Sequence, residues 1–167
     1  MTGKVTIKSR TCYTSDDALL AVTQGHSSDI TIIHTGTNDL KDKTAQEIAD
    51  TIIRTTNIIR GQNRKVVISK LLPREGNQNT KINHTNLLLT RAFKNQNDTY
   101  ITNTQNFYSQ DGPKGDLYTQ EYRNGHKLPL LHLNRQGTIL LSRELQKGIR
   151  TMYYRAYIQP HLDNVAT

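Results

Sequence analysis

The stretch that decides the fold class reads Ile30-Thr31-Ile32-Ile33-His34-Thr35-Gly36-Thr37-Asn38-Asp39. Its run of β-branched residues predicts a buried strand over 30–34, and Gly36 allows a sharp turn directly after that strand. Asn38 then brings a side-chain amide to the carboxyl end of the strand, which is where open α/β sheets place their ligands. The stretch therefore predicts a parallel sheet with polar residues at the ends of its strands.

Helical and extended patterns alternate on both sides of this stretch. Strands are expected over 5–9, 30–34, 65–69 and 99–102, and helices over about 15–25, 45–61, 80–93 and 136–154. The helix after the capping-box pattern Thr44-Ala45-Gln46-Glu47 has isoleucines at helical spacing, so one of its faces should pack on a sheet. In the last helix, Ile139, Leu140, Leu145 and Ile149 are expected to face inward. This order predicts a three-layer α/β/α sandwich with a mainly parallel sheet.

Length and composition limit the class of protein. The 167 residues favour a single domain, expected over 1–158, with a disordered tail over 159–167. One cysteine, Cys12, excludes a disulfide within the chain and suits a reducing compartment. The sequence shows neither a long apolar run nor the apolar core of a signal peptide, so a cytoplasmic location is expected.

The net charge of +8 leaves two interpretations open. The basic residues are scattered, which is typical of a solvated surface, but a basic balance also suits a polyanion such as nucleic acid. Near the C-terminus, Tyr153, Tyr154 and Tyr157 accompany Arg150 and Arg155. These tyrosines either pack on the domain at the end of the last helix or stack on the bases of a single-stranded nucleic acid.

Two segments could carry chemistry. The amide of Asn38 could donate to an oxyanion, or Asn38 and Asp39 could simply cap the turn. His132 lies in His132-Leu133-Asn134-Arg135-Gln136-Gly137, at the start of the last helix. It could be a general base, or a polar loop residue. The sequence has no zinc-ligand spacing and no glycine-rich phosphate loop, so no metal or cofactor is expected.

The order of these segments resembles the SGNH/GDSL hydrolase family, and most of all the esterase-like domains of some animal retroelement open reading frames. The resemblance covers roughly residues 5–150 and rests on Gly36-Thr37-Asn38-Asp39-Leu40, Leu72-Pro73-Arg74, Asn86 and His132-Leu133-Asn134 with Gly137. It implies a flavodoxin-like sheet, Asn38 in an oxyanion hole, His132 as the base, and Gly36 and Asp39 in a supporting turn. A small acyl ester would be the substrate.

The chain also departs from that family. It contains no Gly-Asp-Ser, which the family places before the segment matched by 5–9, so the first and normally central strand is missing. Cys12 occupies the position of the oxyanion glycine, where it could also be a nucleophile. Pro129 stands where the family has the acid that orients the histidine. An alternative match places Asn124-Gly125 there, with Glu121 or Asp116 as substitutes for the acid.

Three interpretations follow. The first is an SGNH hydrolase-like domain, related to carboxylic-ester hydrolases, that is weak or inactive as it stands. The second is a non-catalytic interaction module, a retroelement-derived fragment that binds nucleic acid through a basic surface. The third is a truncated product that folds poorly because the loss of a central strand exposes an unpaired edge.

Overall fold

The computed structural model describes residues 6–25 and 28–165, and a parallel sheet forms the centre of this part of the chain. Its three strands have the order β1-β2-β3 and span Ile30–Ile33, Lys65–Ile68 and Thr99–Ile101. Ile30 pairs with Lys65, and Val66 pairs with Thr99. The predicted parallel sheet is thus confirmed, with strands one residue shorter than expected.

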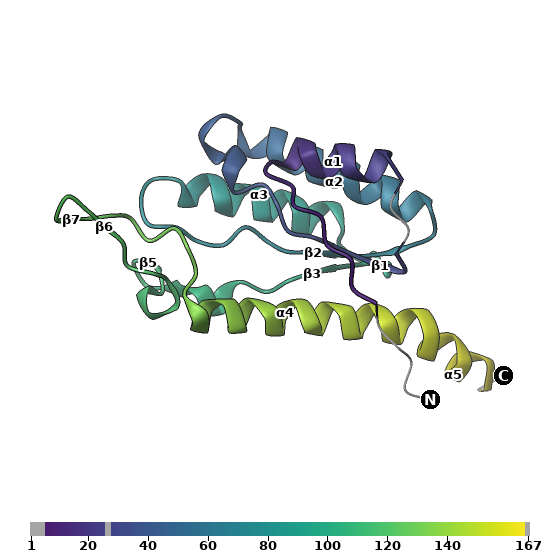
Figure 1. Cartoon of the computed structure of the whole chain (residues 1–167). Coiled ribbons are helices and arrows are strands. Elements are labelled where there is room, and N and C mark those ends of the chain that lie inside the picture. The colour runs from purple at the N-terminus through teal and green to yellow at the C-terminus, as the bar shows by residue number, and fades with distance from the viewer. Residues whose placement is uncertain (1–5, 26–27, 166–167) are drawn as a thin grey trace.

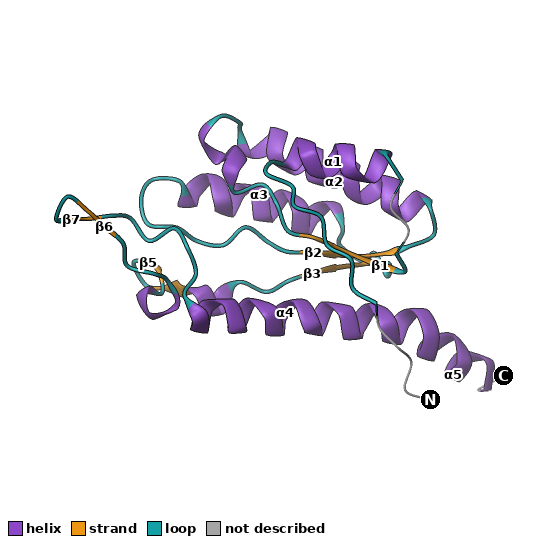
Figure 2. Cartoon of the chain, viewed as in Figure 1, coloured by secondary structure: helices purple, strands orange, loops and turns teal. Residues whose placement is uncertain are grey.

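Helices cover both faces of the sheet, as Figures 1 and 2 show. On one side lie α1 (Ser15–Thr23), α2 (Ala45–Gly61) and α3 (Asn79–Ala92), and on the other lies α4 (Arg135–Tyr153). The predicted three-layer α/β/α sandwich is therefore confirmed. Beyond α4 the chain continues through a π-helical turn, η4 (Tyr154–Ile158), into α5 (Gln159–Val165). Residues 159–165, expected as a disordered tail, thus form a short helix, and none of its residues is buried.

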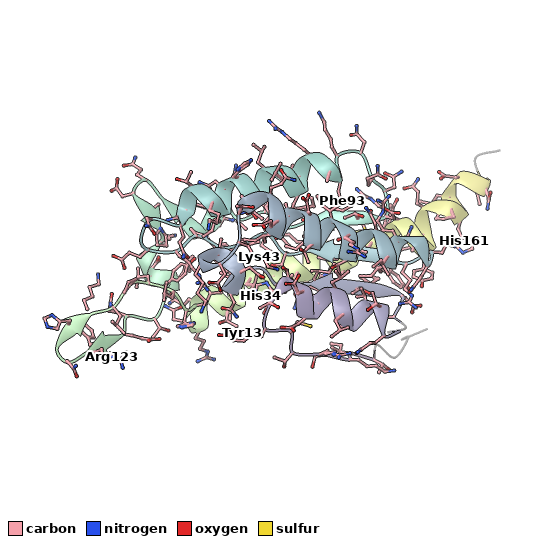
Figure 3. The ribbon with its side chains drawn as sticks, turned by 90° about the horizontal axis from the view of Figure 1, so that it is seen from above. Tyr13, His34, Lys43, Phe93, Arg123 and His161 are labelled. Carbon is pink, nitrogen blue, oxygen red and sulfur yellow. The ribbon has the colours of Figure 1, made fainter. Side chains whose placement is uncertain are left out.

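Short elements fill the loops at the carboxyl ends of the strands. They are η1 (Asn38–Lys41), η2 (Gln105–Phe107), β4 (Tyr108–Ser109), β5 (Gly112–Pro113), η3 (Gly115–Leu117), β6 (Tyr122–Arg123) and β7 (His126–Lys127). The pairs β4–β5 and β6–β7 are small antiparallel hairpins. The β6–β7 hairpin with Arg123 and α5 with His161 lie at opposite ends of the molecule (Figures 1 and 3).

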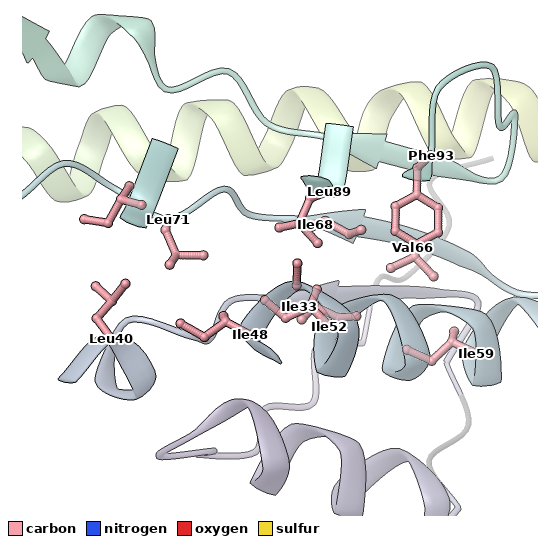
Figure 4. Packing of buried hydrophobic residues seen from close by; sticks show 12 residues of the cluster. Ile33, Leu40, Ile48, Ile52, Ile59, Val66, Ile68, Leu71, Leu89 and Phe93 are labelled. Carbon is pink, nitrogen blue, oxygen red and sulfur yellow. The ribbon is translucent and has the colours of Figure 1, made fainter. Parts of the chain in front are cut away.

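The main core lies between the sheet and the helices α2 and α3 (Figure 4). Ile48, Ile52 and Ile59 of α2 are almost completely buried, and they belong to the same cluster as Val66 and Ile68 of β2. The helical spacing of the isoleucines therefore predicted the buried face of α2 correctly. A second, smaller cluster packs beneath the loop that precedes α4 and contains Phe107, Leu117, Tyr118 and Leu130.

Two sequence-based expectations about packing were wrong. The strand expected over 5–9 is absent, since residues 6–12 have no regular structure, while Val5 lies outside the described residues. In α4, Ile139 is 43% exposed instead of inward, because the face on the sheet contains Gly148 and Met152. A Cβ at Gly148 would lie 2.7 Å from Cγ1 of Val67, so the helix lies too close to β2 for a larger residue.

β1 is an edge strand of this sheet. The Lys65 amide donates to the Asp29 carbonyl and the Ser69 amide to the Ile33 carbonyl, so alternate residues of β1 face β2. The backbone groups of Ile30 and Ile32 therefore point to the outer side, where no other described strand pairs with them. Ile32 is also 40% exposed.

Two capping boxes make the stability of the fold depend on pH. The carboxylates of Asp17 and Glu47 accept hydrogen bonds from the backbone amides of Thr14 and Thr44, which lowers both carboxyl pKa values from their ordinary values of 3.8 and 4.5. Because the folded pKa values are the lower ones, the stabilisation is complete above the ordinary values and is lost as the pH falls through the lowered values. We therefore expect the melting temperature to decrease once the pH is lowered below about 5.

The double variant Asp17→Asn/Glu47→Gln tests this pH dependence. It should melt at a lower temperature than the wild type at pH 7, and the difference should shrink as both proteins are titrated into the acid range. Thermal melts followed by circular dichroism measure this. A difference that stays constant across the range would show that the two carboxylates do not carry the effect.

Candidate functional site

The exposed face of α4 carries a line of basic residues that ends in aromatic ones. Arg143, Lys147, Arg150 and Tyr154 follow each other at intervals of four, three and four residues, so they share one face of the helix. The line is about 17 Å long at 1.5 Å per residue. Tyr153 and Tyr157 flank its end. We call Arg143, Lys147, Arg150, Tyr153, Tyr154 and Tyr157 the α4 stripe, and all six are exposed.

The stripe has little compensating negative charge. Glu144 is the one acidic residue between 135 and 158, and it is buried. It pairs with Lys147, whose Nζ lies 2.6 Å from Oε1, and this hydrogen bond raises the pKa of the lysine. Arg143 and Arg150 form no ion pair or hydrogen bond through their side chains within residues 6–25 and 28–165. Their positive charges therefore face solvent.

The tyrosines of the stripe are about half exposed. Tyr153 is 54% exposed, Tyr154 is 42% exposed and Tyr157 is 45% exposed. The rings of Tyr153 and Tyr157 contact each other, with centroids 4.9 Å apart and planes tilted by 41°. Arg155 donates instead to the carbonyl of Asn97, in the loop before β3. The aromatic rings of this patch are thus partly accessible to solvent.

The first predicted site segment serves as a structural connection. Asn38 begins η1, and its Nδ2 donates to the carbonyl of Tyr13 at 2.8 Å. Gly36 is buried with φ +103°, and a Cβ there would lie 3.1 Å from Cγ2 of Ile48. The side-chain amide of Asn38 therefore holds the segment before α1 against the end of β1. Cys12, in that segment, is a half-buried free thiol.

Asp39 holds the start of α1. Asp39 is 3% exposed, and its carboxylate accepts hydrogen bonds from the backbone amide of Ser15 at 2.9 Å and from the Ser15 hydroxyl at 3.1 Å. Nζ of Lys43 lies 3.0 Å from the same carboxylate and 2.5 Å from Asp16. Figure 3 labels Tyr13, His34 and Lys43 of this region.

The second predicted site segment, around His132 and Asn134, fixes the N-terminus of α4 by hydrogen bonds. Asn134 is its N-cap, accepts from the Gly137 amide at 3.0 Å and donates to the carbonyl of Asp116 at 2.7 Å. The exposed imidazole of His132 makes no hydrogen bond or ion pair in the described part of the chain, while its carbonyl accepts from the Thr119 amide. The side chain of Asp116, a candidate acid partner, lies 4.0 Å from Lys114.

His34 and Ser69 form a polar pair at the ends of two neighbouring strands. Nδ1 of His34, directly after β1, lies 2.8 Å from the hydroxyl of Ser69, directly after β2. Packing around the ring lowers the pKa of His34, although part of the residue remains open to solvent. Ser69 is only 2% exposed, so the pair ties two strand ends together and offers no accessible nucleophile. The parallel alignment of both strands was the signal that could have paired them.

Two other features are absent from the described residues. The described residues contain no group of three or more histidine, cysteine or acidic side chains that could hold a metal ion. Within the same residues, no helix has the length and apolar character needed to cross a membrane.

Comparisons with known proteins match the fold and no sequence family. No family model matches the chain, and no curated protein matches its sequence. Among solved structures, the chain is similar to the crystal structure of the OSK domain of Drosophila Oskar, with a TM-score of 0.64 and 15% sequence identity. The similarity covers 81% of this chain and 69% of the OSK chain. At this identity, the comparison shows a shared fold alone.

These comparisons overturn the resemblance to the SGNH/GDSL hydrolase family. The motif residues that carried the resemblance make structural hydrogen bonds in this fold. Asn38 donates to the carbonyl of Tyr13, Asp39 accepts from the amide of Ser15, and Asn134 caps the N-terminus of α4. No observation supports an acyl-ester substrate. What the sequence and the structure establish together is an α/β sandwich that resembles the OSK domain in fold.

Proposed function

We propose that this protein is a non-catalytic interaction module that binds single-stranded nucleic acid through the α4 stripe. The observation that carries the proposal is the line of exposed cations that leads to three exposed tyrosines. The guanidinium groups of Arg143 and Arg150 would contact phosphates, which attract cations regardless of base sequence. The rings of Tyr153 and Tyr157 would stack on unpaired bases.

Three features support a single strand as the ligand. Aromatic rings that are about half exposed offer faces to unstacked bases, which a duplex does not present. The cations of the stripe continue directly into the aromatic end of the same helix. The net charge of +8 also favours attraction of a polyanion from a distance.

The test is fluorescence anisotropy with a labelled poly(U) strand of about 12 nucleotides, within the usual range of site sizes for such proteins. We expect Arg143→Gln/Arg150→Gln to weaken binding about tenfold and to reduce the slope of log K against log salt by about 1.4. Tyr157→Ala should weaken binding at least about fivefold, since stacking on one base is worth about 1–3 kcal/mol.

The matched control is Arg54→Gln/Arg91→Gln, which removes the same charge from exposed positions on α2 and α3. It should leave most of the affinity in place. Equal losses in the two double variants would show that diffuse charge, and not the α4 stripe, attracts the strand. Equal affinity for a duplex of the same length would show that stacking of the tyrosines on unpaired bases does not contribute to binding.

A further inference from the structure

A hollow of about 300 Å³ lies between α3 and the segments that follow β2 and β3. Lys70 and Thr104 come from those two segments, and Asn83, Leu87 and Thr90 come from α3. The ring of Tyr108 completes the wall. The hollow thus lies at the carboxyl ends of two parallel strands, where open α/β sheets bind their ligands, and it is shallow and widely open to solvent.

The hollow contains a cation without a partner. Lys70 is half-buried, and its ammonium group forms no hydrogen bond or ion pair with any residue in 6–25 or 28–165. Burial lowers the pKa of this lysine. A half-buried cation is less well solvated than one in bulk water, so an anion beside Lys70 would be stabilised.

The neutral groups of the hollow complete a set of donors. The hydroxyl of Tyr108 donates to Oδ1 of Asn83 at 2.7 Å, which fixes the orientation of that amide and leaves its NH₂ group as a donor. The hydroxyl of Thr104 can donate as well. No carboxylate lines the hollow. An ammonium, an amide and a hydroxyl without a competing acid suit an anionic oxygen ligand such as phosphate.

Apolar surface lies beside these donors. Leu87 is 45% exposed, although it lines the hollow together with the ring of Tyr108. We propose that this hollow binds an organic phosphate of the size of a mononucleotide, with the phosphate on Lys70 and Asn83 and the organic part against Leu87 and Tyr108. The site shares no residue with the α4 stripe, so it does not depend on the proposed function.

The experiment is a titration of the full chain by calorimetry and by amide NMR shifts, with adenosine 5′-monophosphate, inorganic phosphate and adenosine as probes. We expect saturable binding of the monophosphate, at least tenfold weaker binding of adenosine, and shifts at Lys70 and Thr104. Lys70→Gln should weaken binding of the monophosphate at least tenfold. Asn83→Asp, which places a carboxylate in the hollow, should abolish that binding.

Lys65→Gln is the matched control, because Lys65 lies at the other end of β2 and does not line the hollow. Melting temperatures of all variants establish that they fold. Arg143→Gln/Arg150→Gln should bind the monophosphate as the wild type does, which separates this site from the α4 stripe. Unchanged binding of the monophosphate by Lys70→Gln would overturn the proposal. So would binding that is not saturated at about 10 mM monophosphate, because such an affinity is very weak.

Competition identifies the source of the phosphate. If a 5′-phosphorylated oligonucleotide displaces the monophosphate and its 5′-hydroxyl counterpart does not, the site holds the end of a nucleic acid strand. If neither displaces it, the site holds a free nucleotide. Either result supports a phosphate site, whereas displacement by adenosine at the same concentration as the monophosphate would contradict it.

Discussion

Gly137→Ala is expected to destabilise the protein by about 3 kcal/mol or more, at the upper end of the cost of overpacking. A Cβ at this position would overlap the backbone carbonyl of Leu117 and would lie 2.8 Å from Cδ2 of Leu133. A backbone obstacle cannot rotate away as a side chain can. Either α4 or η3 must therefore move, and with it the N-cap contacts of Asn134.

Gly61→Ala is the control for this variant. Gly61 is the last residue of α2, and nothing lies within 4 Å of a Cβ built there. Alanine should therefore be neutral or slightly stabilising at position 61, because it has the higher helix propensity. Urea denaturation followed by circular dichroism gives both free energies of unfolding. A loss below about 1 kcal/mol for Gly137→Ala would mean that the chain relaxes easily around the start of α4.

Asp39→Asn is expected to destabilise the protein by about 3 kcal/mol, near the lower end of the cost of breaking a buried ion pair. The neutral amide keeps the size of the side chain but removes the negative charge that faces Lys43. The amide keeps one oxygen as an acceptor, so one of the two hydrogen bonds from the Ser15 amide and hydroxyl is lost where the NH₂ group replaces the other oxygen. The loss is moderated because Lys43 retains Asp16 and is 23% exposed.

The companion variant is Asp42→Asn, which removes the same charge from an exposed position three residues away. It should change the free energy of unfolding by less than about 0.5 kcal/mol. Urea denaturation at pH 7 compares the two proteins. Similar stabilities for Asp39→Asn and Asp42→Asn would show that the connection between β1 and α1 does not depend on the buried carboxylate.

The sequence predicted the strands β1, β2 and β3 and the helices α2 and α3 well because the signals for them are local. The isoleucines of α2 recur at helical spacing, and Thr44 and Glu47 form the capping box that the pattern indicated. α1 begins at Ser15, as expected, but it ends at Thr23, and Thr14 is its N-cap. Ser15 faces Asp39, a partner 24 residues away that no local pattern reveals.

The candidate site was only partly visible in the sequence. The group of tyrosines near Arg150 was apparent, and the spacing of Arg143, Lys147 and Arg150 could have placed them on one line. Whether the tyrosines are exposed depends on how far α4 extends past the sheet, which is a tertiary property. The hollow around Lys70 had no signal, because its walls come from three segments that are distant in the chain.

The sequence by itself determined the alternation of strands and helices, the parallel sheet and the excess of positive charge, since these follow from local propensity, hydrophobic periodicity and composition. Tertiary structure alone decided what the polar motif residues do. Asn38 and Asn134 use their amides on carbonyls that lie 25 and 18 residues away in the chain. A short motif shows which residue types are present. Their hydrogen-bond partners, which determine what they do, come close only when the layers of the fold pack together.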